Sequence, residues 1–403
     1  MKIAIIEPIL SLPYGTSRFA LSVAAALQKL GHQVVIYTNE FNENVFSGLA
    51  RGIDIRVARP KLKEEDLRGA RTIFGKLLQR WQRRSAAAEN SRLIVGLMDK
   101  DFDIIDCQNL YTYRVGYLYK KYVNKNAKVI WSLHDVPWIH RPAGRFLHDA
   151  PRQLNSYLEE VLERKFYCSV DKVVLLENRN YPIAKRLGFA DSQIFLIPWS
   201  GVDEKFYFPV KDIARVKEVR LLSVGALGPP RRYEDIISAV AILKKRKIPA
   251  KATIICRVSP DVVSYKEQIS RFAESLGVAG DIDFHFAGAS DEELREAQRQ
   301  SHFYVSPNTI GIWSMAAAEA MAAGLVLVVS RVTSNAEVLK DGEHALFSDP
   351  GNPVDIADKV DWALKNPKEY ERIALAGQRF VKENFTWEKY AEKLLEATKQ
   401  FNR

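Results

Sequence analysis

The sequence predicts an α/β protein made of two doubly wound domains, each built on a parallel β-sheet. Short β-branched runs alternate with longer segments of helical period, a pattern typical of βαβ units whose sheet is covered by helices on both faces. The chain has 403 residues, enough for two domains that each bury a core. Proline, glycine and aromatic residues interrupt the pattern at 198–209, and this interruption predicts a junction between the domains.

The expected strands form two series, one on either side of that junction. The first series comprises residues 2–6, 34–38, 53–57, 104–106, 129–133, 173–176 and 194–197. The second comprises residues 221–224, 253–256, 282–287, 303–305 and 326–329. A last helix is expected at 387–401. We therefore expect domains at 1–203 and 204–385, with 386–403 packing back toward the N-terminal domain.

The cysteines and the apolar runs of the sequence indicate where in the cell the protein is expected. Cys107, Cys168 and Cys256 are far apart and match neither a metal site nor a disulfide framework, which favours small buried residues in a reducing compartment. The first residues, MKIAIIEP, contain only a short apolar run, so we expect a first strand there rather than a signal peptide. No apolar run is long enough to span a bilayer. A cytoplasmic location is therefore the expectation.

The positive charge is concentrated in the N-terminal half. Residues 1–200 contain 30 Lys and Arg against 20 Asp and Glu, whereas the remainder contains 29 of each. Within residues 51–84 there are 11 basic and four acidic side chains. This excess favours an anionic partner, or it is simply a solvated face. Nucleic acid is not expected as a partner, because no recognised binding module accompanies the charge.

Residues 71–84, RTIFGKLLQRWQRR, read as a basic amphipathic helix. Its apolar side chains share one helical face, and arginines and a lysine surround them. Such a helix can lie in an anionic lipid surface, with tryptophan in the interface and arginines on the headgroups, at the inner face of the membrane. The alternative is a helix that packs on the core and has a solvated basic rim.

The loops that follow the strands carry the candidate site, because parallel sheets bind ligands beyond the carboxyl ends of their strands. After the first strand, Gly15 and Thr16 open a long helix, and Gly15 would let the backbone approach a substrate or simply make a turn. His134 follows the strand at 129–133 and could hydrogen-bond a sugar or a phosphate. A lone histidine is more often structural, so its position supplies most of the argument.

Two loops of the second half are suited to a phosphate-bearing ligand. In GALGPPRRYED, Arg231 and Arg232 precede a helix, and an arginine fork suits a diphosphate; a surface ion pair with Glu234 or Asp235 is the alternative. The segment YVSPNTIGIWSMAAAEAMAAG reads as a buried strand, a polar loop and a helix that carries Glu319 among small apolar residues. Unpaired N–H groups at the start of a helix favour an anion.

In these segments the chain resembles the GT4-like family of retaining, nucleotide-sugar-dependent glycosyltransferases. The resemblance covers nearly the whole length, and the order and spacing of its motifs make it specific. These motifs are Gly15, GHQVVIYT, IPWSGVDEKFYFP, VGALGPPRRYEDIISAV, AGASDEELREAQRQSHFYVSPN, EAMAAGLVLVVS, AEVLKDGEHALF and FTWEKYAEKLLE. It implies the GT-B fold, in which two Rossmann-like domains face an interdomain cleft, the N-terminal domain binds the acceptor and the C-terminal domain binds the donor.

The resemblance also implies roles for individual residues. Glu319 matches the glutamate that holds the nucleotide ribose, and Arg232 matches the basic residue, usually lysine, that neutralises the diphosphate. Arg231 would add to the positive charge there. His134 resembles a histidine that touches the transferring sugar, and Gly15 and Thr16 occupy the loop that faces this sugar. The remaining donor contacts would come from the following residues: Gly311, Ile312, Trp313, Ser314, Met315, Gly288 and Ser290.

Two positions depart from the family pattern. The family's first motif glutamate, which binds donor-sugar hydroxyls, is replaced here by Gly311, and the family's arginine beside the diphosphate is replaced by Ala226.

The activity that the resemblance implies is metal-independent transfer of a sugar, with retention, from a nucleotide-diphosphate sugar, without a cofactor. The acceptor would be a glycan, a lipid-linked molecule or another anionic molecule. Two alternatives remain open: a weak or inactive relative that binds nucleotide or glycan as a partner protein, and a GT-B enzyme of another reaction, such as a phosphorylase or an epimerase.

Overall fold

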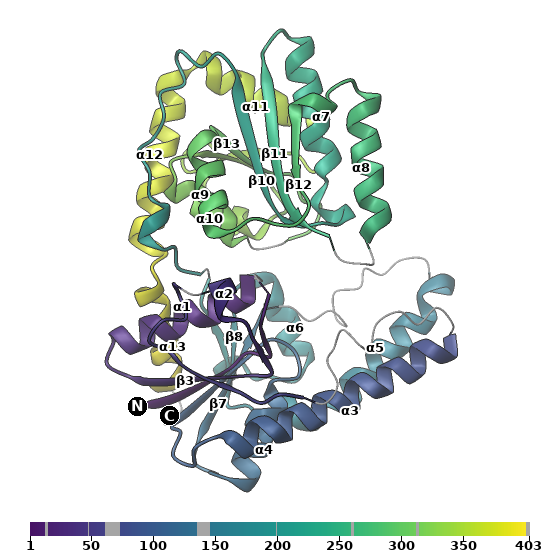
Figure 1. Ribbon diagram of the computed structural model, residues 1–403, viewed down its shortest axis with the longest axis vertical. Coiled ribbons are helices and arrows are strands. Elements are labelled where there is room, and N and C mark those ends of the chain that lie inside the picture. Colours follow the sequence, from purple (N-terminus) through teal and green to yellow (C-terminus); the bar gives the residue numbers. More distant parts are fainter. Residues whose placement is uncertain are drawn as a thin grey trace. The chain divides into compact units, whose positions relative to one another are not determined.

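The chain forms two compact α/β units in the computed structural model, and each contains one parallel sheet (Figure 1). The structure describes residues 1–12, 15–46, 48–60, 73–134, 146–198, 200–258, 262–311 and 314–399. Unit 1 comprises residues 1–198 and 387–403, and unit 2 comprises residues 199–386. The first boundary lies slightly before the position expected from sequence, and the second lies one residue after it.

Unit 1 contains a seven-stranded sheet in the order β5-β3-β1-β6-β7-β8-β9. Its strands are β1 Lys2–Ile6, β3 Gln33–Thr38, β5 Asp54–Val57, β6 Ile104–Gln108, β7 Lys128–Leu133, β8 Lys172–Leu175 and β9 Ile194–Leu196. A separate two-stranded sheet pairs β2 Ile9–Leu10 with β4 Glu40–Phe41. The helices are α1 Gly15–Lys29, α2 Glu43–Phe46, α3 Ile73–Leu97, α4 Tyr113–Tyr122, α5 Phe146–Tyr167, α6 Tyr181–Arg186 and α13 Trp387–Lys399.

Helices cover both faces of the unit 1 sheet, as two parallel-sheet faces require. Side chains of α3, α4 and α5 pack on one face together with alternate residues of the strands, among them Cys107 and Trp131. On the other face α13 packs against α1, where Phe19 lies edge-to-face against Trp387 and Tyr390. Residues 387–399 are thereby part of unit 1 although they follow unit 2 in the sequence.

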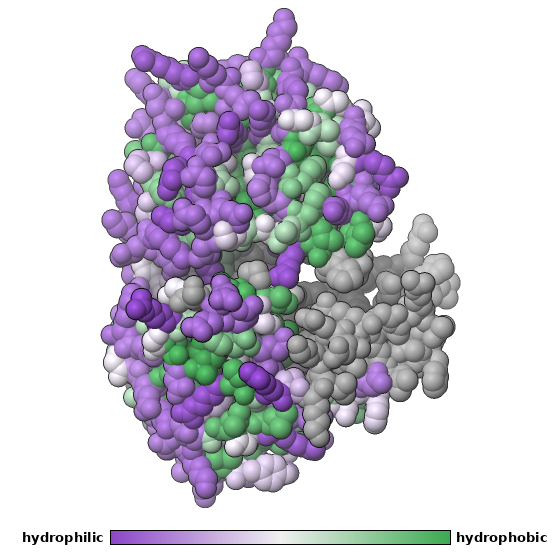
Figure 2. All heavy atoms as spheres, viewed as in Figure 1, coloured by the Kyte–Doolittle hydropathy of each residue, from purple (hydrophilic) through white to green (hydrophobic). Residues whose placement is uncertain are grey.

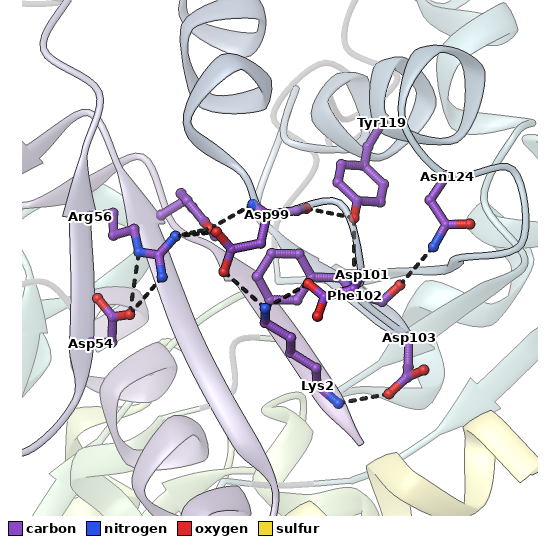
Figure 3. A network of polar contacts seen from close by, with 10 residues as sticks. Lys2, Asp54, Arg56, Asp99, Asp101, Phe102, Asp103, Tyr119 and Asn124 are labelled. Atoms are coloured by element: carbon purple, nitrogen blue, oxygen red, sulfur yellow. Dashed lines mark hydrogen bonds and ion pairs between the residues drawn. The ribbon is translucent and has the colours of Figure 1, made fainter.

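A network of ion pairs and hydrogen bonds links the amino ends of several unit 1 strands (Figure 3). Lys2 bridges Asp99 and Asp101, and Arg56 bridges Asp54 and Asp99. These two cations hold the pKa of Asp99 at about 2. The network lies at the strand ends opposite to those where parallel sheets bind ligands, so we assign it to stability.

Unit 2 contains a six-stranded sheet in the order β12-β11-β10-β13-β14-β15. Its strands are β10 Val219–Ala226, β11 Ala250–Arg257, β12 Ile282–His285, β13 Phe303–Ser306, β14 Val326–Ser330 and β15 Leu346–Ser348. Its helices are α7 Tyr233–Lys245, α8 Val263–Ser275, α9 Asp291–Gln300, α10 Met315–Ala322, α11 Pro353–Lys365 and α12 Pro367–Asn384. One core lies between the sheet and α7, α8 and α11, and a second includes α10.

Every strand expected from sequence is present, with ends that differ by at most three residues. Three strands were not expected: the short pair β2 and β4, and β15, whose three residues are too few to show a period. The described part of the chain has no helix that is long and apolar enough to cross a bilayer. Hydrophilic residues cover most of the face in Figure 2, and the apolar residues that show there form small patches.

Candidate functional site

The switch point of unit 2 lies between β10 and β13, because the chain builds the sheet outward from β10 in one direction and from β13 in the other. Crevices at such switch points bind ligands in open parallel sheets. The loops after these strands are joined by a hydrogen bond from the Thr309 N–H to the Pro230 carbonyl (3.0 Å). The structure therefore brings together the two loops that the sequence singles out.

Tyr304, at the second position of β13, fixes the end of one loop to the other. Its hydroxyl donates to the Val224 carbonyl (3.1 Å) and lies 3.2 Å from the Ser314 hydroxyl. Ser314 is the N-cap of α10, and its Oγ accepts from the Ala317 N–H (3.3 Å). The start of α10 is thereby held at a defined place beside the end of β10.

The neighbouring arginines of this loop have different surroundings. Arg232 lies in the left-handed region (φ +55°) and donates from Nε and Nη2 to the two oxygens of buried Asp235 (3.0 and 2.6 Å). This ion pair raises the pKa of Arg232. The surface ion pair considered as the alternative from sequence is thus present, and it occupies two corners of the guanidinium.

Arg231 instead lies against the backbone of Gly225. A Cβ added at Gly225 would be 3.0 Å from Cζ of Arg231, so a side chain at position 225 would push the guanidinium a few tenths of an ångström away from this place. Its positive charge faces the hydroxyls of Tyr233 and Tyr304 and acts to lower their pKa values against the larger effect of burial. Within the described residues its side chain makes no hydrogen bond or ion pair.

Buried polar groups border the same loops. Glu319 is only 3% exposed in α10, and Asn308 is 1% exposed in the loop after β13, where its Nδ2 has no partner among the described residues. Gly311 ends the described part of that loop. Ile312 and Trp313 lie outside the described residues, so the structure does not place two of the four backbone groups expected to meet the phosphates. Met315 is the first residue of α10.

Gly288 and Ser290 follow β12, as expected, at the start of α9. Gly288 has a φ of +82°, and its N–H donates to the Cys256 carbonyl (3.1 Å). Ser290 and Glu293 form a reciprocal capping box, in which the Ser290 Oγ accepts from the Glu293 N–H and the Ser290 N–H donates to the Glu293 carboxylate. The Ser290 side chain is therefore engaged in starting a helix.

The switch point of unit 1 lies between β1 and β6, and a buried carboxyl occupies it. Glu7 follows β1 and is 3% exposed; its Oε2 accepts from Asn109 Nδ2 (2.6 Å). Burial raises the pKa of Glu7 to about 8, although the Ile9 N–H and Asn109 both donate to it. Asn109 and Tyr111 have φ values of +68° and +66°, which are costly for residues other than glycine.

His134 belongs to a polar cluster on the α1 and α13 face of the unit 1 sheet. Asp106 and Gln108 of β6 point to this face together with Ser132 and His134 at the end of β7, because alternate strand residues share a face. Ser132 Oγ donates to Asp106 Oδ1 (2.7 Å), Gln108 Nε2 donates to Asp106 Oδ2, and Gln108 Oε1 contacts His134 Nε2.

Burial sets the charges of this cluster. It lowers the pKa of His134 to about 4 and raises that of Asp106 to about 6. His134 keeps partial exposure, and its ring packs edge-to-face on Phe19 with 4.7 Å between centroids. At neutral pH His134 is therefore an uncharged hydrogen-bonding group rather than a cation for a phosphate.

Gly15 and Thr16 form the first turn of α1, where Gly15 is exposed and Thr16 partly exposed. Ser17 attaches this turn to β2, because its Oγ donates a hydrogen bond to the Ile9 carbonyl (2.6 Å). Residues 13 and 14, which directly precede Gly15, lie outside the described residues.

The basic amphipathic segment is described only in part. Residues 71 and 72 and the side chains of 73–80 lie outside the described residues. Trp81 of α3 is 68% exposed, whereas Arg84 pairs with buried Glu163 of α5 (3.1 Å). Arg84 thus belongs to an internal ion pair and is not part of a free basic rim.

Several polar residues around both switch points were missed by the sequence reasoning: Glu7, Asp106, Gln108, Asn109, Asn308 and Tyr304. A signal for two of them was present, because Asp106 and Gln108 interrupt an otherwise apolar strand at alternate positions. Tyr304 gave no such signal, since an aromatic residue in a strand is ordinary.

Comparison with known proteins agrees with this two-unit arrangement. The model of "Glycosyltransferase Family 4" matches residues 13–205, and that of "Glycosyl transferases group 1" matches residues 208–380. The chain is 26% identical over 220 residues to mannosylfructose-phosphate synthase of Agrobacterium fabrum, covering 52% of this chain and 48% of that protein. It is 27% identical over 200 residues to an MMP alpha-(1->4)-mannosyltransferase of Mycolicibacterium hassiacum, covering 49% and 46%.

The matched regions span about half the length of these two curated relatives. Among solved structures, Anabaena HepE in complex with UDP and glucose superposes with a TM-score of 0.72 at 14% identity, covering 99% of each chain. The two parallel-sheet units, each with its own switch point, define a protein of the GT-B fold. The chain belongs to the GT4-like family of glycosyltransferases.

Proposed function

We propose that the protein transfers a sugar from a nucleotide-diphosphate sugar to an acceptor hydroxyl, with retention at the anomeric carbon. The observation that carries the proposal is the Arg231 guanidinium, which lies over Gly225 at the switch point of unit 2 without a side-chain partner among the described residues. A cation in this position can meet the negative charge of a leaving diphosphate. The names of the relatives, a mannosyltransferase and a synthase of a mannosyl product, support this class of reaction.

The proposed donor site is unit 2. Glu319 accepts hydrogen bonds from the ribose hydroxyls, and the backbone at the start of α10, from residue 312 to Met315, donates to the phosphates. The loop containing Gly288 and Ser290 flanks the base. Arg231 makes the principal contact with the diphosphate. Arg232 makes a further contact through the N–H groups of its guanidinium that do not bond to Asp235.

The reaction that fits these groups is a front-face displacement. The bond from the anomeric carbon to the diphosphate oxygen breaks while the acceptor oxygen bonds to the same face of the sugar. The acceptor proton passes to the departing phosphate oxygen, so no protein base is required. Arg231 stabilises the charge that develops on the diphosphate. We propose that neither a metal nor another cofactor takes part, and full activity in EDTA is the expected result.

Unit 1 is the proposed acceptor domain. Gly15 and Thr16 start α1 at the carboxyl edge of its sheet, and His134 lies at the end of β7. A glycan, a lipid-linked molecule or another anionic molecule is the acceptor class that we propose, on account of the basic excess in residues 1–200.

A panel of UDP-, GDP- and ADP-sugars tests the proposal, with release of nucleoside diphosphate as the readout in the presence and absence of oligosaccharide acceptors. UDP-glucose is the first donor to try, because the Anabaena neighbour is a complex with UDP and glucose. Turnover that falls in Arg231→Ala supports the proposal. If no donor gives transfer or hydrolysis while nucleotide still binds, the protein is instead the non-catalytic relative that binds nucleotide as a partner protein. The presence of Gly311 and Ala226 at the two motif positions favours this alternative.

We further propose a cytoplasmic protein that touches the inner face of an anionic membrane. The supporting observation is exposed apolar surface on two helices of unit 1, namely Trp81 of α3 and the side chains of Tyr157, Leu158, Val161 and Leu162 of α5, which are 47–63% exposed. These four residues lie at helical spacing on one face. Flotation with vesicles containing phosphatidylglycerol is expected to recover the wild type and lose Trp81→Glu; equal recovery of the two would remove this part of the proposal.

A further inference from the structure

The Asp106–Gln108–His134 chain is a hydrogen-bonded relay that ends at a partly exposed histidine. The Asp106 carboxylate accepts from Ser132 at one oxygen and from the Gln108 amide at the other. An ionised carboxylate can only accept, so the Gln108 amide must turn its NH₂ toward Asp106 and its Oε1 toward His134. The orientation of Gln108 is thus decided by Asp106.

The orientation of Gln108 in turn decides which nitrogen of His134 carries the proton. Gln108 Oε1 is an acceptor, and His134 Nε2 lies within hydrogen-bonding distance of it. A bare Nε2 would place two lone pairs against each other, whereas a protonated Nε2 donates a hydrogen bond. The neutral imidazole has one N–H, so Nδ1 is left with a lone pair. Within the described residues, Nδ1 has no hydrogen-bond partner.

We propose that Asp106 and Gln108 are positioning residues that hold His134 as its Nε2–H tautomer, so that Nδ1 is a fixed acceptor for a hydroxyl of the sugar or of the acceptor substrate. The role of the substrate hydroxyl rests on the proposed function; the tautomer does not. His134 binds a hydroxyl in this account and does not take its proton, because its low basicity makes it a poor base at neutral pH.

The packing around the ring supports this assignment. Phe19 of α1 lies edge-to-face against His134, and Tyr390 of α13 places its hydroxyl beside Asp106 and Ser132. Phe19 and Tyr390 belong to the two helices that cover this sheet face. They restrict the plane of the His134 ring and the position of the Asp106 carboxylate independently of Gln108. Partners that orient a functional histidine through its other nitrogen commonly govern its tautomer.

Nitrogen-15 NMR of the full chain with labelled histidine measures the tautomer directly at pH 7.5, with the His134 signals assigned from His134→Asn. The expected wild-type spectrum has a pyrrole-type Nε2 and an imine-type Nδ1. A protonated Nδ1 in the wild type overturns the proposal without any need for a folded variant of the relay.

Two variants then test the relay itself. Gln108→Leu is expected to give a mixture of both tautomers, whereas Ser132→Ala, which leaves the Gln108 link in place, is expected to keep Nε2–H. A spectrum of folded Gln108→Leu identical to that of the wild type would overturn the role of Gln108. With an active donor, Gln108→Leu is expected to lower kcat/KM about 10-fold, the equivalent of one hydrogen bond.

The two failures can be told apart. If the donor panel gives no transfer but His134 is Nε2–H and responds to Gln108→Leu, the proposed function falls and the relay stands. If transfer occurs while His134 exchanges between tautomers in the wild type, the relay falls and the proposed function stands.

Discussion

The two units share one architecture but differ in what they place at their switch points. In unit 1, burial raises the pKa of the Glu7 carboxyl to about 8, so this group is protonated at neutral pH. It accepts hydrogen bonds from Asn109 and from a backbone N–H. In unit 2 a guanidinium lies over Gly225 without a side-chain partner among the described residues. The same sheet topology thus carries a neutral, internally satisfied carboxyl in one unit and, in the other, a guanidinium that has no hydrogen bond or ion pair within the described residues. Topology places a site, and single side chains decide its ligand.

The largest expected effect separates the two arginines of unit 2. Arg231→Ala should lower turnover with a nucleotide sugar by about 10² to 10³, the usual consequence of removing one donor that stabilises developing negative charge. Steady-state kinetics with the donor found in the panel would measure it.

Arg232→Gly is the matched variant. It removes a guanidinium from the same loop, and glycine suits the φ of +55° better than arginine does. It leaves the buried carboxylate of Asp235 without its partner, so we expect a loss of stability of about 1–3 kcal/mol and a smaller loss of turnover than in Arg231→Ala. A larger loss of turnover in Arg232→Gly would reverse the assignment of the two arginines.

The buried glutamates of the two units should differ in their effect on nucleotide binding. Glu319→Gln should weaken nucleotide binding about 10-fold, because a neutral amide replaces the carboxylate that accepts from the ribose hydroxyls. Glu7→Gln should leave nucleotide affinity unchanged. Calorimetric titration of UDP, GDP and ADP into each variant would measure both. Equal affinities of Glu319→Gln and the wild type would remove Glu319 from the donor site.

The stability of unit 1 depends on pH through Glu7. The folded protein keeps Glu7 protonated to about pH 8, whereas the unfolded chain ionises it near 4.5, so the folded state binds more protons between these values. The free energy of unfolding therefore decreases as the pH rises through this window, and we expect Glu7→Gln to remove about 1 kcal/mol or more of that decrease between pH 5 and pH 8.

Hydrogen exchange of the β1 and β6 amides, corrected for the intrinsic rate, reports on this region without requiring two-state unfolding of the whole chain. Glu319→Gln is the control, since its unit 2 position should leave the protection of β1 unchanged. An identical pH slope in Glu7→Gln and wild type would refute the protonated state of Glu7.

The smallest expected effect is that of one methyl group. Gly225→Ala should displace the Arg231 guanidinium by a few tenths of an ångström, at little cost in stability because the contact is with the end of a flexible side chain. We expect a loss of a few-fold in nucleotide affinity, a fraction of the loss in Arg231→Ala. Combining the two changes should add nothing to Arg231→Ala alone, and additive losses would show that Gly225 acts separately.

The sequence was sufficient for the fold because hydrophobic period is a local signal that needs no knowledge of tertiary contacts. It revealed the parallel strands of both units and the loops at their carboxyl ends. It also indicated that the C-terminal residues pack back toward the N-terminal domain, and residues 387–403 do belong to unit 1. It could not reveal β15, since three residues show no period, nor that the partner of residues 387–399 is α1, which depends on contacts remote in sequence.

The site could be predicted only to the level of loops. The resemblance pointed to Arg232 as the diphosphate contact, with Arg231 beside it, and the proposal made from the structure exchanges these roles. Only the backbone conformation distinguishes the two arginines, since the left-handed residue 232 turns its side chain toward Asp235. The relay from Asp106 to His134 was hidden for a similar reason. Its members come from two strands that are neighbours in the sheet but separated by α4 in the sequence.

Nucleotide binding by the two arginine variants is the sharpest test of Arg231 as the diphosphate contact, because it needs neither the acceptor nor the transferred sugar. UDP, GDP and ADP are titrated calorimetrically into wild type, Arg231→Ala and Arg232→Gly at low salt. We expect at least one nucleotide to bind the wild type and Arg231→Ala to lose about 10-fold or more of this affinity, with a clearly smaller loss in Arg232→Gly. Equal affinity in Arg231→Ala and the wild type would contradict it.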